Sequence, residues 1–121
     1  MKITKKQFVK EWINDLRSGK FRKCTGKLYK NGCYCALGVA CKTGERLGIP
    51  GGGFAKYHDD NSQTRNDYSP GLWFEKIMGT DDPFVLTVSK SKFTVIDLND
   101  AYKYKLRDIA DALERTYLKR K

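Results

Sequence analysis

Four cysteines close together are the residues of this 121-residue chain best suited to chemistry. They are Cys24, Cys33, Cys35 and Cys41, in the spacing C-x8-C-x-C-x5-C. This spacing lacks the paired C-x2-4-C knuckles that place two thiolates on one zinc ion. We therefore expect no metal, no other cofactor and no disulfide, and interpret the four side chains as buried or half-buried thiols. A structural zinc site is the alternative.

A catalytic thiol is a second hypothesis for the same stretch. Cys35 lies where a predicted strand meets the N-terminus of a predicted helix, which is an environment that lowers the pKa of a thiol. His58 is the only histidine, and Asn99 or Asp100 could orient it, in the chain order of papain-like cysteine hydrolases. The apolar neighbours of Cys35 favour burial instead, so we name no catalytic residue and expect a protein that is not an enzyme.

The net charge of the chain points to a binding function. It is +10 overall, and it is concentrated at the two ends. Residues 1–30 carry ten Lys and Arg against two acidic residues, whereas residues 31–100 carry seven against nine. Residues 101–121 again carry seven against three. If the two ends pack together, they make one positive surface that attracts polyanions.

A basic hairpin with interleaved aromatic residues is the predicted centre of that surface. Such surfaces hold phosphates and stack bases. The aromatic contacts are expected from Tyr29 and Tyr34, and a solvated hairpin face is the alternative. The predicted polyanion-binding residues are Lys20, Arg22, Lys23, Lys27, Lys30, Lys119, Arg120 and Lys121.

A pocket for a host nucleotide signal is the runner-up hypothesis. It would be lined by Tyr29, Tyr34, Trp73 and basic side chains, beneath the segment 48–68. A compact apolar pocket with convergent cations would favour such a sequestering protein over an open basic face.

Two predicted helices frame the cysteine stretch. Residues 4–18 carry their apolar side chains on one helical face and begin with a capping box at Thr4. A second helix is predicted from Ala36 and ends at Gly44. Gly38 within it allows another backbone to approach closely.

Two hairpins are predicted. Residues 21–29 and 33–35 form strands joined by a type I′ turn at Asn31–Gly32, because both turn positions need a positive φ. Residues 84–88 and 93–96 are rich in β-formers and make the second hairpin.

The remaining segments are a loop and two helices. Residues 48–68 show little periodicity and are interpreted as an exposed, mobile loop. A short helix with Ser69 as its N-cap ends at Gly79, and Asn99–Asp100 turns or caps the chain before the last helix.

These elements predict one α+β domain over residues 1–121. Its N- and C-terminal helices pack on a small antiparallel sheet made of the two hairpins, with a short central helix and a long loop. We see no signal peptide and no membrane span, and we expect a cytoplasmic protein that has no membrane partner.

Four short motifs carry a resemblance to a family. They are W-x-x-x-L-R-S-G-K (12–20), G-x-L-x-x-x-G-x-Y-C-x-L-G-V-x-C (26–41), L-N-D (98–100) and I-A-D-x-L-E (109–114). Together they resemble small proteins of unknown function encoded by tailed phages and prophages. Many members carry a double cysteine where this chain has Cys35–Ala36, which weakens any mechanism that needs a thiol at position 36.

The resemblance implies a phage accessory protein that acts in the cytoplasm of the host cell. Combined with the charge, it leads to the expectation of a non-enzymatic host-interaction protein. Its partner would be a polyanion such as nucleic acid or an acidic host protein.

Overall fold

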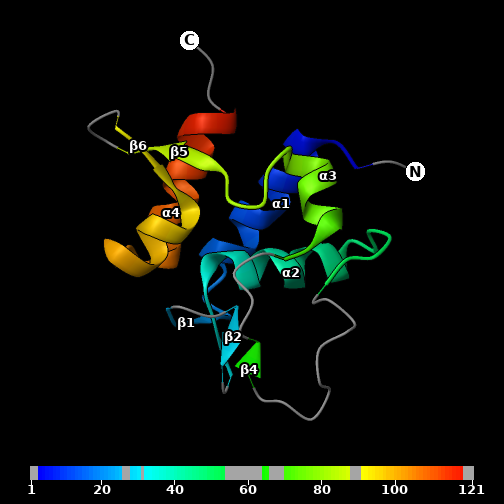
Figure 1. Cartoon of the computed structure of the whole chain (residues 1–121), viewed down its shortest axis with the longest axis horizontal. Helices are drawn as coiled ribbons and strands as arrows, with labels where there is room; N and C mark the ends of the chain where they lie inside the picture. Colours follow the sequence, from blue (N-terminus) through cyan, green and yellow to red (C-terminus); the bar gives the residue numbers. More distant parts are fainter. Residues whose placement is uncertain are drawn as a thin grey trace.

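The computed structural model describes residues 3–25, 28–30, 32–53, 64–65, 70–87 and 91–118 (Figure 1). In chain order, the elements are α1 (Lys5–Arg17), β1 (Arg22–Lys23), β2 (Tyr29–Lys30), β3 (Cys33–Tyr34), α2 (Ala36–Arg46), β4 (Thr64–Arg65), α3 (Leu72–Met78), β5 (Phe84–Leu86), β6 (Lys92–Thr94), the π-helical turn η1 (Asp97–Ala101), α4 (Leu106–Leu113) and the π-helical turn η2 (Glu114–Leu118). The predicted α+β fold class is confirmed, with helices at both ends of the described chain.

Helix α1 lies at the centre of the molecule. The predicted capping box is confirmed, because the Gln7 N–H donates to the Thr4 hydroxyl and the Thr4 N–H donates to the Gln7 side chain. The apolar face of α1 is buried and packs against α2, α3, α4 and η2. Its buried residues are Phe8, Val9, Trp12, Ile13 and Leu16.

The strands form two separate sheets. One has four strands in the order β1-β3-β2-β4, and the other is the antiparallel pair β5-β6. The predicted second hairpin is confirmed, and so is the first, because Lys30 pairs with Cys33 across two turn residues. Gly32 in that turn has a φ of 90°, which favours glycine; Asn31 lies outside the described residues.

Three details of the predicted sheet are wrong. The two hairpins belong to separate sheets and do not form a single one. The first strand is not continuous over residues 21–29: β1 ends at Lys23 and pairs with β3 in parallel, so the four-stranded sheet is mixed. The chain leaves the sheet because Leu28 is buried, 1 % exposed, and its carbonyl accepts the Cys35 N–H. Residues 64–65, predicted as loop, pair with β2 as β4. The other residues of the predicted mobile loop lie mostly outside the described ranges.

The N-terminus of α2 is held by two side chains from distant segments. The buried Asn99 side chain accepts the Ala36 N–H through Oδ1 at 3.0 Å. The Trp12 indole N–H donates to the carbonyl of the same residue, also at 3.0 Å. Asn99 therefore supports the first N–H of α2, whose N-cap residue is Cys35. The predicted turn before the last helix is confirmed, because Asn99 and Asp100 lie in η1, but Asn99 does not cap that helix, since Lys105 is the N-cap residue of α4.

Two glycines let other groups pack directly on α2. A Cβ at Gly38 would lie 1.9 Å from the Leu28 carbonyl oxygen, so the predicted close backbone approach is confirmed. A Cβ at Gly44 would lie 2.5 Å from the Trp73 ring. Gly44 was predicted to end α2, but the helix continues to Arg46 because this glycine makes room for an aromatic ring rather than for a turn.

Helix α3 also begins later than predicted. Its N-cap is Gly71, with a φ of 124°, and Pro70 is buried ahead of the helix. Its end at Gly79 is confirmed by a left-handed C-cap conformation there. Ser69, the predicted N-cap, lies outside the described residues.

Asn99→Ala tests the support of α2. We expect this substitution to lower the free energy of unfolding by about 2 kcal/mol, because it removes the side-chain acceptor of the buried Ala36 N–H, and an unsatisfied buried group costs about 1–3 kcal/mol. Urea unfolding followed by circular dichroism measures it. The matched control is Asn14→Ala on the exposed face of α1, and equal stability of the two variants would contradict the assignment.

Candidate functional site: a cationic hollow

A shallow hollow opens where the end of α1 meets the beginning of α4. The two helices pack side by side, and this brings the basic N-terminal third of the chain next to its basic C-terminal segment. The hollow has a volume of about 290 Å³. We call it the cationic hollow, and its lining residues are Leu16, Arg17, Gly19, Phe21, Lys23, Lys105, Leu106 and Arg107.

The cationic hollow combines an apolar part with a positive one. Leu16 and Leu106 are buried core residues, and Phe21 is half-buried and packs against the core. Four cationic side chains stand around them, two from residues 17–23 and two from the start of α4. An anion with an apolar portion could contact both parts.

The four cations are not equally available. Arg17 Nη2 lies 2.6 Å from an Asp111 oxygen and 2.9 Å from a Glu114 oxygen. Hydrogen bonds to Glu114 and then Asp111 raise the pKa of Arg17, because they favour its charged form. The charge of Arg17 is therefore largely balanced from α4. Lys23, Lys105 and Arg107 provide the attraction for an incoming anion.

Lys23 is the most buried of these three cations. Burial lowers the pKa of its ammonium group, the Asp100 carboxylate opposes this effect, and the neighbouring charge of Lys103 adds to it. A bound phosphate would favour the charged form of Lys23. Lys103 itself has a φ of 57°, a left-handed conformation that is uncommon for a residue other than glycine.

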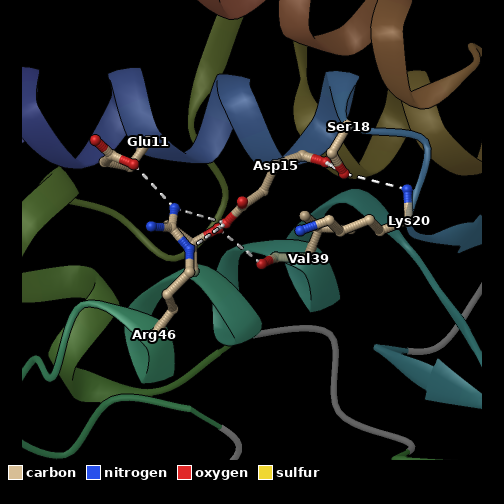
Figure 2. Close-up of polar contacts among 7 residues, drawn as sticks. Glu11, Asp15, Ser18, Lys20, Val39 and Arg46 are labelled. Atoms are coloured by element: carbon tan, nitrogen blue, oxygen red, sulfur yellow. Dashed lines mark hydrogen bonds and ion pairs between the residues drawn. The ribbon is translucent and has the colours of Figure 1, made fainter.

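The acidic residues of the first thirty positions are paired elsewhere. Arg46 of α2 lies 2.9 Å from Glu11 and 3.1 Å from Asp15, and the Thr43 hydroxyl donates to Asp15 at 2.6 Å. Figure 2 shows these contacts between α1 and α2. Because both carboxylates are paired with Arg46, they weaken the positive potential of the cationic hollow less than unpaired carboxylates would.

A row of aromatic rings leads away from the hollow. Phe21 meets Tyr34 edge to face at 5.2 Å between ring centroids, and Tyr34 lies 5.0 Å from Tyr29. Strand register explains the row, because Lys23 pairs with Tyr34 and Tyr34 with Tyr29 across three strands. Cross-strand partners share a face of a sheet, so Lys23 stands on the face of the two tyrosines. We call Phe21, Tyr34 and Tyr29 the aromatic row.

The structure brings together only some of the residues predicted to form the site. Lys23, Tyr29 and Tyr34 lie together as described above. Arg22 is exposed and pairs with Cys33, so it occupies the neighbouring row, on the other face of the sheet. Lys20 is exposed in the turn after α1, where its backbone N–H donates to the Ser18 hydroxyl (Figure 2).

Five predicted residues cannot be placed in the site. Lys30 pairs with Cys33 through its backbone in β2. The others lie outside the described ranges, and they are Lys27, Lys119, Arg120 and Lys121.

Sequence reasoning missed Phe21, Lys105 and Arg107. The positive balance of residues 101–121 signalled a second basic segment, but the predicted patch was placed at the chain end rather than at the start of α4. The difference arises because it is the first turn of α4 that packs beside the end of α1.

Trp73, expected in the nucleotide pocket, belongs to the core. It is 7 % exposed, packs edge to face on Phe8 and Phe74, and donates its indole N–H to the Gly53 carbonyl. Its ring is therefore engaged in packing rather than in lining a pocket.

Cys35 has the position expected for an activated thiol but the opposite pKa shift. Its sulfur accepts the Gly38 N–H at 3.4 Å at the N-terminus of α2. Burial nevertheless raises the pKa of the thiol from 9.0 to about 11, because desolvation outweighs this hydrogen bond. The expected lowering of the Cys35 pKa is wrong, and the proposed partner His58 lies outside the described residues.

Two further properties bear on function. Within the described ranges, no group of three or more His, Cys, Asp or Glu side chains is arranged to hold a metal ion. In the same part of the chain, no helix is both long and apolar enough to cross a membrane.

The chain matches no protein-family model, no curated protein and no solved structure. Its function has to be argued from the cationic hollow and the aromatic row.

The raised pKa of Cys35 leads to a prediction about the reactivity of its thiol. Only the thiolate reacts with iodoacetamide, so the alkylation rate of Cys35 in the native protein should rise about tenfold for each pH unit from 7 to 9, without a plateau. Mass spectrometry of peptides from protein sampled over time measures the rate, with urea-unfolded protein as the control. A rate that already levels off near pH 7 would contradict the burial argument.

Proposed function

We propose that this protein is a non-enzymatic binding protein for a polyanion and that the cationic hollow is its binding site. The convergence of cations from two distant segments carries the proposal. Lys23 comes from β1, whereas Lys105 and Arg107 come from the start of α4. Like charges repel one another when gathered, so such a cluster is costly unless an anion is bound there.

The chemistry around the hollow supports binding more than catalysis. Lys23, whose pKa is lowered by burial, interacts with the Asp100 carboxylate and the Lys103 ammonium. The Cys35 thiol, at the N-terminus of α2, is buried and protonated at neutral pH. A site of this kind holds phosphates or carboxylates by charge and hydrogen bonding.

The biological setting completes the proposal. The four sequence motifs resemble small phage-encoded proteins, so the protein would act in the cytoplasm of an infected host cell. Nucleic acid and acidic host proteins are the polyanions available there. The +10 net charge would increase the rate of encounter with either of them.

Salt dependence tests the proposal. With three cations contacting phosphates, log affinity for a fluorescein-labelled oligonucleotide should fall with log salt with a slope of about −2 to −3. Fluorescence anisotropy in a potassium chloride series measures the slope. Polyglutamate serves as the acidic-protein probe, and it should show a similar loss of affinity with salt if the partner is a protein.

Charge-removing variants locate the site. The double substitution Lys23→Gln with Arg107→Gln should reduce the steepness of the slope by about 1 to 2. The matched control is Lys76→Gln on the exposed surface of α3, which lies on the opposite side of Figure 1 from α4. A wild-type slope near zero for both probes would contradict the proposal. A control variant whose slope became as shallow as that of the double variant would contradict it as well.

A further inference from the structure

We infer that the polyanion is single-stranded nucleic acid, held with one base in the cationic hollow and neighbouring nucleotides along the aromatic row. This inference rests on the proposed function and names the class of ligand for the same site. In the proposed complex Phe21 and Tyr34 contact the ligand in addition to the cations. The site would therefore prefer single strands to duplexes and to acidic proteins.

The composition of the hollow matches a nucleotide unit. Its volume of about 290 Å³ lies near the lower limit of small-molecule sites, so it can take one base with its sugar and phosphate. The apolar surface of Leu16, Phe21 and Leu106 suits the faces of a base. Lys23 and Arg107, which also line the hollow, suit the phosphates on either side of that base.

Acidic side chains would use the hollow less completely. A carboxylate could pair with Lys23 or Arg107, but it would leave the apolar surface around Phe21 without a contact. A base with its phosphate fills both parts at once, and base stacking on an aromatic ring contributes about 1–3 kcal/mol per base. Arg107 can also stack its planar guanidinium on a base.

A duplex cannot use the aromatic part of the site. In double-stranded nucleic acid the base faces are covered by neighbouring base pairs, so a half-buried ring such as Phe21 cannot reach them. A single strand can turn its bases outward. The aromatic row continues from Phe21 through Tyr34 to Tyr29 with centroid spacings of 5.2 and 5.0 Å and ring planes inclined at 87° and 51°, so it offers neighbouring bases separate aromatic contacts and not one continuous stack.

The location of the row relative to the cations supports the same ligand. Lys23 is the register partner of Tyr34 in the parallel pair of β1 and β3. The cation and the ring therefore lie side by side on one face of the sheet, as a phosphate and its adjacent base require. Register places Arg22 on the opposite face, so we leave it out of the bound strand's path.

The experiment compares two probes on the full chain by fluorescence anisotropy at one salt concentration. The probes are a labelled oligothymidylate of about twelve nucleotides, within the range of known single-strand sites, and a random-sequence duplex of the same length. We expect the single strand to bind at least about tenfold more tightly. Equal affinities would overturn the inference but leave the proposed polyanion function intact.

Two variants separate stacking from charge. Phe21→Leu should weaken single-strand binding about tenfold and leave the salt slope and duplex binding unchanged, because it removes a ring and no charge. The matched control is Phe84→Leu, which removes a 59 % exposed ring from β5. Strand β5 contacts η2, which follows the end of α4, whereas the cationic hollow lies at the start of α4. The inference would be overturned if Phe21→Leu left the affinity for the single strand unchanged, or if Phe21→Leu and Phe84→Leu lowered it equally.

A crosslinking measurement uses the unmodified protein and does not depend on how a variant folds. A 4-thiothymidine oligonucleotide, irradiated in the complex and mapped by peptide mass spectrometry, should attach to the peptide containing Phe21 or Tyr34. Attachment only elsewhere would contradict the inference.

Two further outcomes identify other ligands. Thymidine 5′-monophosphate that competes as well as the oligonucleotide would indicate nucleotide capture, and it would overturn the inference. If polyglutamate bound in a salt-dependent way and the oligonucleotide did not, the inference would also be overturned, and an acidic protein would be the favoured ligand. If neither the oligonucleotide nor polyglutamate bound, both the inference and the proposed function would fail.

Discussion

The rest of the structure depends on how the backbone of Ala36, the first residue of α2, is held. The Ala36 N–H is bound by Asn99 from 63 residues away, and its carbonyl is bound by Trp12 from 24 residues away. Both contacts are buried, and an unsatisfied buried group costs about 1–3 kcal/mol, so α2 cannot shift along α1 without a large loss. The Leu28 carbonyl packs so closely on Gly38 that no side chain fits there.

The same polar centre sets the geometry of the candidate site. Asn99 also donates to the Cys24 carbonyl, directly after β1, and to the Asp100 carboxylate. These bonds hold the end of β1 against η1, and this places Lys23 near Asp100 and opposite the start of α4. The cationic hollow is therefore built on a rigid core, although its cations stand on short and exposed segments.

The sequence motifs at 12–20, 26–41 and 98–100 coincide with this centre. Trp12, Gly38 and Asn99 each belong to one of them, and each acts by packing or hydrogen bonding. This explains why the motifs say little about function. The proposed binding site draws only partly on them: Tyr34 lies within a motif, whereas Lys105 and Arg107 lie between motifs.

The sequence by itself determined the features that depend on near neighbours. The capping box of Thr4 and Gln7, the turn at Gly32 and the helix end at Gly79 involve groups a few residues apart, so local pattern was sufficient. Only the tertiary structure decided the parallel pairing of β1, the support of α2 by Asn99 and the raised pKa of Cys35. Each of these depends on packing between distant segments. The cationic hollow belongs to the second group. Charge at the two chain ends predicted a positive surface, but which cations converge was settled by the packing of α1 on α4.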